Sequence, residues 1–526
     1  MTADRREILK GAAAAVALAA LNRPARATQI TAPLAQTSYG PVRGTLDEGI
    51  AVFKGIRYGA DTAPRRFQAP LPPTPWSDPV DATAFGAASP QKEIDEAVSE
   101  DCLFLNVWTP GLDAGRRPVM VYLHGGAYTS GSGSHPLLDG RRLAARGDVV
   151  VVTLNHRLNL FGYAYLARFG DSDMLHSGNA GTLDLVLALA WLRDNIAAFG
   201  GDPGQVMLFG QSGGGAKIAT LMAVPAAAGL FHRAATMSGQ QLTASGPLNA
   251  TKRAAALLDT LGLKPERVSA LRALPVATLT AALDTIDPII GSGRLYFGPV
   301  LDERTLLRHP FYPDAPGQSA AIPMMLGNTH DETRSLIGGN DDSAFKLGWS
   351  DLPERLIAHM RVDIAPETVI AEYRRLYPGY APSDVFFAAT TASRSWRAAV
   401  VEAELRAAQR SPAFVYQLDW PSPLDGGKWG APHTHDIALV FGTLDARGSY
   451  TGTGEAARAM SERLMDTFIA FARTGNPNSP ALPRWEPYEL PRRQTMVFDT
   501  ATRLEDDPRG AERRLFARVP FIQQGT

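Results

Sequence analysis

The chain has 526 residues, of which 45% are hydrophobic and 20% are charged, and its formal net charge at pH 7 is -1. This is the composition of a globular protein large enough to bury a sizeable core without disulfides or a structural metal. The near-neutral charge argues against a basic surface for nucleic acid or anionic membranes, so we expect no nucleic-acid partner.

The first 27 residues have the pattern of an export signal. Arg5-Arg6-Glu7-Ile8-Leu9-Lys10 resembles a bacterial twin-arginine motif, and an apolar run follows that is too short to span a bilayer. Ala25-Arg26-Ala27 offers small residues for cleavage. We expect residues 1–27 to be a twin-arginine signal and residues 28–526 a single domain, exported to the periplasm or secreted, with no membrane attachment after signal removal. An ordinary secretory signal or a frayed helix is the alternative.

Apolar segments predict alternating strands and helices in the rest of the chain. The stretch 40–44 is typical of a turn that opens a small β region, and 64–79 is typical of an ordered surface loop. We predict strands at 118–123, 149–154 and 205–209, and helices at 183–198 and from 216 onward. Strands that are apolar on both faces and alternate with helices indicate an α/β fold with a mostly parallel sheet between helical layers. Further helices, at 250–285 and 340–410, are predicted to be insertions that cover the sheet.

Cys102 is the single cysteine of the sequence. An exported protein with one cysteine has no internal disulfide, which fits a chain that folds in the reducing cytoplasm before export. A thiol or zinc-thiolate enzyme is therefore disfavoured, and we expect Cys102 to be a buried structural residue.

The strongest motif is Gly210-Gln211-Ser212-Gly213-Gly214, which lies between a predicted strand and a predicted helix. A serine at a sharp strand-to-helix turn needs small residues two positions before and after it, and the turn lifts its hydroxyl above the sheet. The free N–H groups of the helix N-terminus lie beside it. We therefore predict that Ser212 is a nucleophile rather than an ordinary turn serine.

A serine nucleophile needs a base, and the base needs a carboxylate that orients it. His433 lies in a loop rich in glycine and proline, and His435 fits equally well by position. Asp331 and Glu332 follow an apolar strand predicted at 322–326. The chain order serine, acid, histidine is that of α/β-hydrolases, but the residues leave the choice within each pair open.

The segment His124-Gly125-Gly126-Ala127 follows a predicted strand and resembles the glycine motif of an oxyanion hole. Gly125 and Gly126 would donate backbone N–H groups to the oxyanion, and Gly213 would supply a third donor. A plain glycine turn explains the same residues, and the two interpretations are compatible.

A metal site is the weaker interpretation of the histidines near the end of the chain. His433, His435 and Asp436, or His330 with Asp331, are possible ligands, but no HExxH or CxxC motif accompanies them. Since a serine site already explains His433, we expect no metal and no cofactor.

Two longer segments identify a family. Residues 199–214 read FGGDPGQVMLFGQSGG, and residues 100–107 read EDCLFLNV. Both resemble signatures of the type B carboxylesterase/lipase family, which includes cholinesterases, liver carboxylesterases and bacterial para-nitrobenzyl esterases. The resemblance covers nearly all of residues 36–500. It implies the α/β-hydrolase fold, with helical insertions over the active site, and a serine hydrolase that cleaves carboxylic esters through an acyl-enzyme on Ser212.

The resemblance also chooses between neighbouring candidates. It implies that the acid is Glu332 and that the base is His433. The oxyanion donors that it implies are Gly125, Gly126 and Gly213. A family serine that braces the acid corresponds to Ser238.

Some positions depart from the family, and others are part of its scaffold. Gln211 stands where glutamate is usual, so we expect altered electrostatics near the acyl site. Thr333 replaces the glycine that usually follows the acid. Arg66 and Glu100 resemble a structural ion pair of the family.

The substrate is expected to be a small-molecule ester, and the sequence leaves its chain lengths and the oligomeric state open. Candidates for the pocket wall are Leu295, Tyr296, Phe297 and Trp429, for which core packing is an equal explanation. The same triad would also serve for carbamates, amides, lactones or polyester oligomers. A non-catalytic binding or adhesion protein of the family is disfavoured because the triad is complete.

Overall fold

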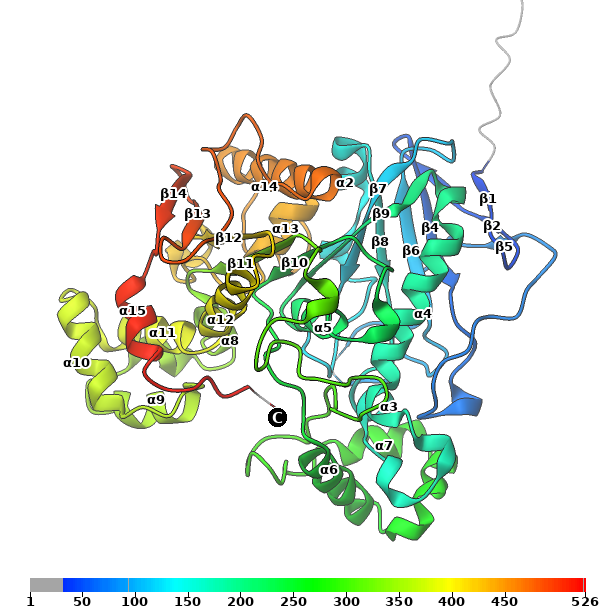
Figure 1. The fold of residues 1–526 in the computed structure, drawn as a ribbon, viewed down its shortest axis with the longest axis horizontal. Helices are drawn as coiled ribbons and strands as arrows, with labels where there is room; N and C mark the ends of the chain where they lie inside the picture. The colour runs from blue at the N-terminus through cyan, green and yellow to red at the C-terminus, as the bar shows by residue number, and fades with distance from the viewer. Residues whose placement is uncertain (1–31, 93, 524) are drawn as a thin grey trace, which may run out of the picture.

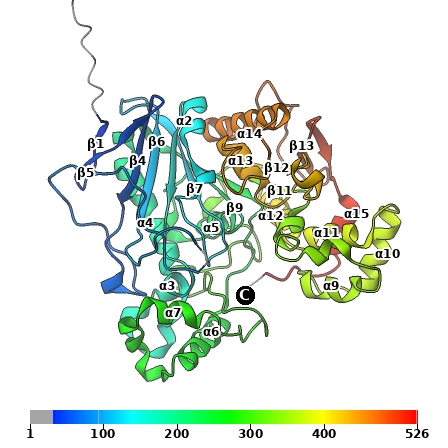
Figure 2. The same ribbon diagram turned by 180° about the vertical axis from the view of Figure 1, so that it is seen from behind.

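The computed structural model describes residues 32–92, 94–523 and 525–526. The export signal predicted at residues 1–27 lies outside these ranges. A large sheet runs through the protein with helices on both faces (Figures 1 and 2). Within the described ranges, no helix is both long enough and apolar enough to cross a membrane.

The large sheet has 11 strands, in the order β14-β13-β12-β11-β10-β9-β7-β8-β6-β4-β3. Their bounds are β3 (Thr45–Asp47), β4 (Ile50–Arg57), β6 (Phe104–Thr109), β7 (Arg117–Leu123), β8 (Val150–Leu154), β9 (Gly201–Gln211), β10 (Arg233–Met237), β11 (Met324–Thr329), β12 (Ala413–Leu418), β13 (Gln494–Phe498) and β14 (Arg503–Asp506). The strands from β8 to β13 pair in parallel, and the strands at both edges pair antiparallel. The predicted mostly parallel sheet is therefore confirmed.

A small sheet near the N-terminal end has the order β1-β2-β5. Its strands are β1 (Leu34–Gln36), β2 (Pro41–Arg43) and β5 (Val80–Asp81). The turn predicted at 40–44 is wrong for its central residues, because Val42 is buried and pairs with β1 and β5.

The α-helices lie on both faces of the large sheet and at one end of the molecule (Figures 1 and 2). Their bounds are α2 (Arg141–Gly147), α3 (Asn159–Tyr163), α4 (Ala180–Asn195), α5 (Gly213–Leu221), α6 (Pro247–Thr260), α7 (Val276–Ala282), α8 (Glu332–Leu336), α9 (Leu352–His359), α10 (Pro366–Leu376), α11 (Pro382–Ala392), α12 (Ser395–Ala408), α13 (His435–Phe441), α14 (Glu455–Thr474) and α15 (Gly510–Phe516). The helices predicted at 250–285 and 340–410 are present, as α6 and α7 in one group and as α9 to α12 in another.

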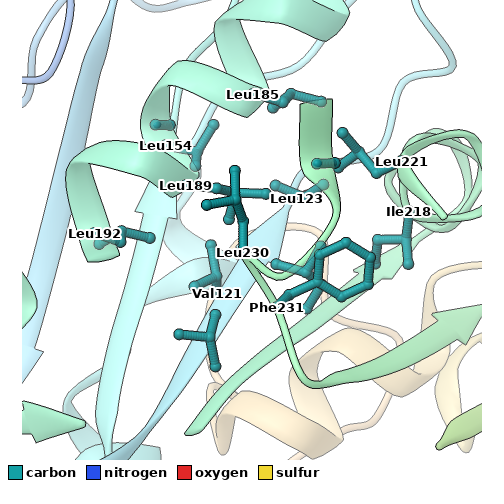
Figure 3. Packing of buried hydrophobic residues seen from close by; sticks show 14 of the residues in the cluster. Val121, Leu123, Leu154, Leu185, Leu189, Leu192, Ile218, Leu221, Leu230 and Phe231 are labelled. Atoms are coloured by element: carbon teal, nitrogen blue, oxygen red, sulfur yellow. The ribbon is translucent and has the colours of Figure 1, made fainter. Parts of the chain in front are cut away.

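Both faces of the sheet are buried, which the alternation along β7 shows. Val119, Val121 and Leu123 point into one core cluster, and Met120 and Tyr122 point into another. Figure 3 shows Val121 and Leu123 among leucine and isoleucine side chains of α4 and α5. Because helices cover both faces, a substrate can reach the strands only at their ends, where α/β folds place their sites.

Candidate active site

Ser212 occupies a strained turn between β9 and α5. Its φ is 56° and its ψ is -123°, a conformation that costs a non-glycine residue on the order of 1–3 kcal/mol. The backbone around it holds this turn: the Ser212 N–H donates to the Met237 carbonyl at 2.8 Å. A β-carbon at Gly239 would lie 1.8 Å from the Ser212 carbonyl oxygen, so glycine is required there. The geometry is that of the predicted nucleophile turn.

Glu332 and His433 contact each other at the end of β11. His433 Nδ1 bonds Glu332 Oε2, and both side chains are buried. The other carboxylate oxygen accepts hydrogen bonds from the Thr329 N–H at 3.1 Å and from Asn328 Nδ2 at 3.2 Å. Because the carboxylate engages Nδ1, Nε2 is the ring nitrogen of His433 that Glu332 leaves free.

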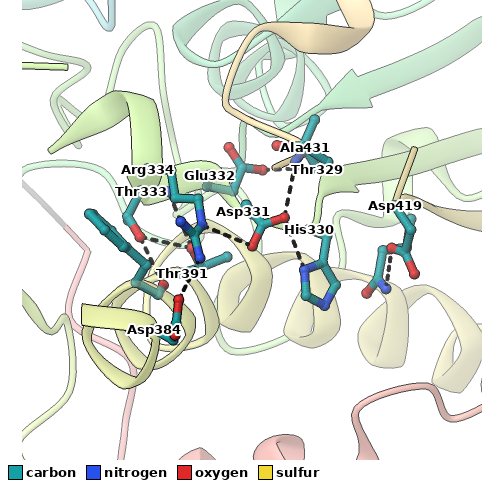
Figure 4. Close-up of polar contacts among 12 residues, drawn as sticks. Thr329, His330, Asp331, Glu332, Thr333, Arg334, Asp384, Thr391, Asp419 and Ala431 are labelled. Carbon is teal, nitrogen blue, oxygen red and sulfur yellow. Dashed lines mark hydrogen bonds and ion pairs between the residues drawn. The ribbon is translucent and has the colours of Figure 1, made fainter. Parts of the chain in front are cut away.

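Asp331, the neighbouring carboxylate, has a different environment (Figure 4). It accepts a hydrogen bond from the Ala431 N–H at 3.0 Å and lies 3.3 Å from His330 Nδ1 and 3.6 Å from Arg334 Nε. Burial acts to raise the pKa of Asp331, but the bond and charge of His330, the Ala431 N–H and the charge of Arg334 together hold that pKa below its usual value. Asp331 therefore anchors the loop that precedes His433, and Glu332 is the carboxylate that reaches the imidazole.

His435 is buried against an aromatic side chain rather than near Glu332. Its ring stacks on Trp420 with the centroids 5.3 Å apart, and burial lowers the pKa of His435 to about 3. The structure thus brings His433 and not His435 to the acid. In the described part of the chain, no three His, Cys, Asp or Glu side chains form a group that could hold a metal ion.

Gln211 lies against the imidazole of His433. Its Nε2 is 3.1 Å from His433 Nε2 and 3.3 Å from His433 Nδ1. The Ser212 hydroxyl forms no hydrogen bond with any residue that the structure describes. Because the Gln211 amide nitrogen is nearly equidistant from the two ring nitrogens, it lies beside the imidazole and not in line with the lone pair of Nε2. Hydrogen bonds of catalytic groups commonly tighten only when substrate is bound.

The loop after β7 packs directly against the Ser212 turn. A β-carbon at Gly125 would lie 3.1 Å from the Gln211 carbonyl oxygen and 3.5 Å from Ser212 Cβ. A β-carbon at Gly213 would lie 2.5 Å from the Ala127 nitrogen. The predicted glycines therefore lie beside Ser212. There is no room for a side chain at Gly213, and a side chain at Gly125 would require its neighbours to shift.

Lys217 is a buried cation behind this loop, and sequence reasoning missed it. Its Nζ donates to the His124 carbonyl at 2.9 Å and lies 5.9 Å from the centre of the Tyr128 ring. Burial lowers the pKa of Lys217 to about 7. The His124 carbonyl and the Gly125 N–H belong to one peptide group, so the ammonium polarises a predicted oxyanion donor. The sequence feature that could have revealed it is a lone lysine among the mostly small and apolar side chains of helix α5.

Ser238 supports the acid indirectly. Its N–H donates to the Gly327 carbonyl at 2.7 Å, and its Oγ lies 3.4 Å from the Thr329 nitrogen, whose N–H also reaches Glu332. Ser238 therefore holds the end of β11 from which the acid projects.

Thr333 ties the helix that carries the acid to α11. Its hydroxyl is 2.9 Å from the Phe387 carbonyl, 2.8 Å from the Thr390 hydroxyl and 2.9 Å from the Thr391 hydroxyl. A glycine at this position could make none of these bonds. The departure from the family pattern is thus compensated by a packed hydroxyl cluster, and Glu332 keeps its place.

A cavity of about 130 Å³ opens beside Ser212. Its wall includes Gly213, Ser238, Gln240, Tyr296, Arg394 and Phe521. Of the four predicted pocket residues, Tyr296 alone lines this cavity. Leu295 lines a neighbouring one of about 360 Å³, to which Tyr296 also contributes.

Phe297 and Trp429 lie elsewhere. Phe297 is packed in a core cluster that includes Tyr128. Trp429 donates to Asp425 Oδ2 at 2.6 Å and packs edge-on against Phe345. Neither lines the cavity beside Ser212.

The predicted scaffold residues are confirmed. Arg66 Nε bonds Glu100 Oε1 at 2.6 Å, and both side chains are buried. Arg66 also donates to the backbone carbonyls of 271, 272 and 274, so the pair joins two distant segments. Cys102 is a free thiol with no exposed surface.

Comparison with known proteins gives one consistent result. Residues 31–516 match the sequence profile described as the carboxylesterase family. Para-nitrobenzyl esterase of Bacillus subtilis (strain 168) is 34% identical over 503 residues, which cover 92% of this chain and 98% of that protein. Phenmedipham hydrolase of Pseudarthrobacter oxydans is 33% identical over 484 residues, covering 87% and 93%. The solved structure of the Geobacillus stearothermophilus carboxylesterase EST55 at pH 6.2 superposes with a TM-score of 0.82 at 36% identity, covering 92% and 99%.

Proposed function

Because the chain belongs to the carboxylesterase family and is a carboxylic ester hydrolase, we propose that Ser212 forms the acyl-enzyme, with His433 as its base and Glu332 as the orienting acid. The observation that carries this proposal is the contact between His433 Nδ1 and Glu332 Oε2 beside the strained Ser212 turn. The carboxylate fixes the imidazole with Nε2 free to take a proton, and it stabilises the imidazolium that results.

The reaction proceeds in two steps of acyl transfer. As Ser212 Oγ attacks the ester carbonyl, His433 Nε2 takes its proton and then gives it to the leaving alcohol. Water repeats the cycle on the acyl-enzyme. The N–H groups of Gly125, Gly126 and Gly213 bind the oxyanion, and each such donor is worth about 10² to 10³ in rate.

Gln211 lies beside the imidazole of His433 and adds no charge there. Its amide nitrogen is 3.1 Å from Nε2 and 3.3 Å from Nδ1, so it does not lie in line with the lone pair of Nε2 to which the Ser212 hydroxyl would donate. A neutral amide at this position interacts more weakly with the imidazole than a charged partner would, because charge-assisted hydrogen bonds are about twice as strong.

A fluorophosphonate probe and intact mass measurement test the nucleophile. We expect one adduct on the wild-type protein and none on Ser212→Ala. An adduct that persists on Ser212→Ala, or a wild-type protein that gains no mass, contradicts the assignment.

Two histidine variants test the base. His433→Ala is expected to abolish turnover of para-nitrophenyl acetate, whereas His435→Ala removes only a ring stacked on Trp420 and should keep most of it once folding is matched by circular dichroism. The reverse result would move the role to His435.

Phenmedipham is a second candidate substrate, because the hydrolase of that compound is 33% identical over nearly the whole chain. The same triad would also serve for other carbamates, amides, lactones or polyester oligomers. A panel of para-nitrobenzyl esters, phenmedipham and anilides would rank these classes by kcat/KM. A protein inactive on every ester in the panel would favour a binding role instead.

We further propose that residues 1–27 direct export through the twin-arginine route to the periplasm or beyond. The motif Arg5-Arg6 followed by an apolar run supports this, as does a single cysteine in a chain that would fold before export. When the full chain is expressed in a bacterial host, fractionation should place the protein in the periplasm. Replacing Arg5 and Arg6 together by lysine should retain it in the cytoplasm, and unchanged export would reject the route.

A further inference from the structure

Part of the wall of the cavity beside Ser212 is cationic. Arg361 and Arg394 both line it, as does Ser395, the first residue of α12. The N-terminus of α12 thus faces the cavity, and a helix N-terminus carries free N–H groups and a partial positive charge. An acyl pocket for simple fatty esters would need none of these groups.

Arg394 carries a charge that no carboxylate neutralises directly. Its Nη1 donates to the His359 carbonyl at 3.1 Å, and it forms no ion pair with any acidic residue in the described part of the chain. Burial, together with the nearby Arg361, lowers the pKa of Arg394 to about 10, so the group remains protonated at neutral pH. The carboxylate whose charge acts on Arg394 is Glu332, and that group is engaged by His433.

Gln240 is an independent sign of a polar ligand. The residue lines the same cavity and is only 7% exposed. Neither its amide oxygen nor its amide nitrogen has a hydrogen-bond partner among the described residues. Leaving a buried polar group unpaired is costly, and proteins seldom do so without a functional reason. An oxygen ligand in the cavity would accept from the Gln240 amide nitrogen.

The acidic residues around the cavity do not oppose an anion there. Glu402 accepts the N–H of Gln241, a lining residue, and burial raises the pKa of Glu402 to about 8, so this carboxyl is mostly neutral at pH 7. Glu332 is bonded to His433. Gln211, beside the nucleophile, is neutral where the family usually has glutamate.

We propose that this cavity holds an acyl group that ends in a carboxylate, so that the preferred substrates are monoesters of short dicarboxylic acids. The far carboxylate would bind Arg394, Arg361 and the Gln240 amide nitrogen while the ester carbonyl lies at Ser212. A cavity of about 130 Å³ favours a short acyl chain. The proposal rests on Ser212 as nucleophile, and the reaction stays the established one: water is added across the ester to release the dicarboxylate and the alcohol.

Two methyl esters of matched size test this preference. Monomethyl glutarate carries the far carboxylate, and methyl glutaramate replaces it with a neutral amide of the same shape. We expect kcat/KM of the wild-type protein to be at least tenfold higher for the hemiester. In Arg394→Met the ratio of kcat/KM for the hemiester to kcat/KM for the amide should fall at least tenfold, because a charge-assisted bond to the carboxylate is lost. Arg458→Met, which removes an exposed arginine of α14, should leave the ratio unchanged.

Inhibition of the wild-type protein gives a test that needs no variant to fold. Glutarate should inhibit hydrolysis of methyl glutaramate competitively, at least tenfold more strongly than glutaramide does, and added salt should weaken it. Equal inhibition by the two compounds, or a wild-type ratio near one, would overturn the proposal. If the proposed function itself were wrong, the result would differ: Ser212→Ala would hydrolyse both esters at the same rate as the wild-type protein.

Discussion

Replacing Lys217 by methionine should stabilise the protein at low pH. Methionine keeps the length of the side chain in helix α5 but removes the buried ammonium. That group has one hydrogen bond, to the His124 carbonyl at 2.9 Å, and burial lowers its pKa from 10.5 to about 7. In the unfolded chain the lysine keeps its ordinary pKa, so the folded protein disfavours the charged form.

The size of the effect follows from the difference in pKa between the two states. At about 1.4 kcal/mol for each pKa unit, keeping Lys217 protonated in the fold costs roughly 5 kcal/mol below pH 7. Between about pH 7 and pH 10.5 the unfolded chain holds a proton that the folded protein has released. The free energy of unfolding of the wild-type protein therefore rises with pH in this window. Lys217→Met leaves the His124 carbonyl without its donor, at about 1–3 kcal/mol, for a net gain of roughly 2–4 kcal/mol at low pH.

Urea unfolding at about pH 6 and about pH 9 measures this contribution. The variant should be more stable than the wild-type protein at about pH 6, and the difference should shrink at about pH 9. The kcat for ester hydrolysis should also fall, by up to about tenfold, because the peptide that carries the Gly125 N–H is no longer polarised. A stability difference that does not change with pH, or a variant less stable at about pH 6, would refute the reasoning.

Three further predictions concern other parts of the structure. Gly239→Ala places a β-carbon 1.8 Å from the Ser212 carbonyl oxygen, so kcat for para-nitrophenyl acetate should fall at least a hundredfold; near-wild-type turnover would show that the turn tolerates the methyl group. Thr333→Val removes the hydroxyl that bonds Thr390 and should lower the free energy of unfolding in urea by about 1–3 kcal/mol, whereas an unchanged midpoint would deny the cluster a structural role. Burial raises the pKa of the Cys102 thiol far above its ordinary value, so iodoacetamide should label Cys102 in denaturant and leave the folded protein unlabelled at about pH 8.

Local sequence patterns predicted the central strands because burial on both faces leaves a continuous apolar run. The predicted strands at 118–123 and 149–154 differ from β7 and β8 by one residue at their start. β9 is longer than predicted, since Gly201 pairs with Arg117 of β7 before a register irregularity, after which the pairing resumes at Val206. Helix α5 begins at Gly213 and not at Ala216. The prediction began too late because glycines have weak helix propensity, and the start of the helix is set by the turn at Ser212.

In the candidate site, too, local features were predictable from the sequence and tertiary contacts were not. Ser212 was predictable because its turn, its glycines and its helix are local. The sequence pattern around His433 and His435 could not separate them, since the difference is the tertiary stacking of His435 on Trp420. The family resemblance chose His433, and His433 is the histidine that contacts Glu332.

The cavity wall was the least predictable part. Gln240 and Arg394 come from segments far apart in the sequence, and no local motif marks either of them. Trp429 does not line this cavity, because its indole N–H is bonded to Asp425 within its own loop. That contact depends on the tertiary path of the loop, which no local pattern encodes.

The long separations between the site residues make enzyme activity a reporter of folding. Glu332 and His433 are 101 residues apart, and Gln211 and His433 are 222 residues apart. Since contacts between distant segments form slowly, a partly refolded chain can recover helix content while the hydrolytic centre is still unassembled. Regain of esterase turnover after dilution from denaturant should therefore lag behind the far-ultraviolet circular dichroism signal and mark the last step of assembly.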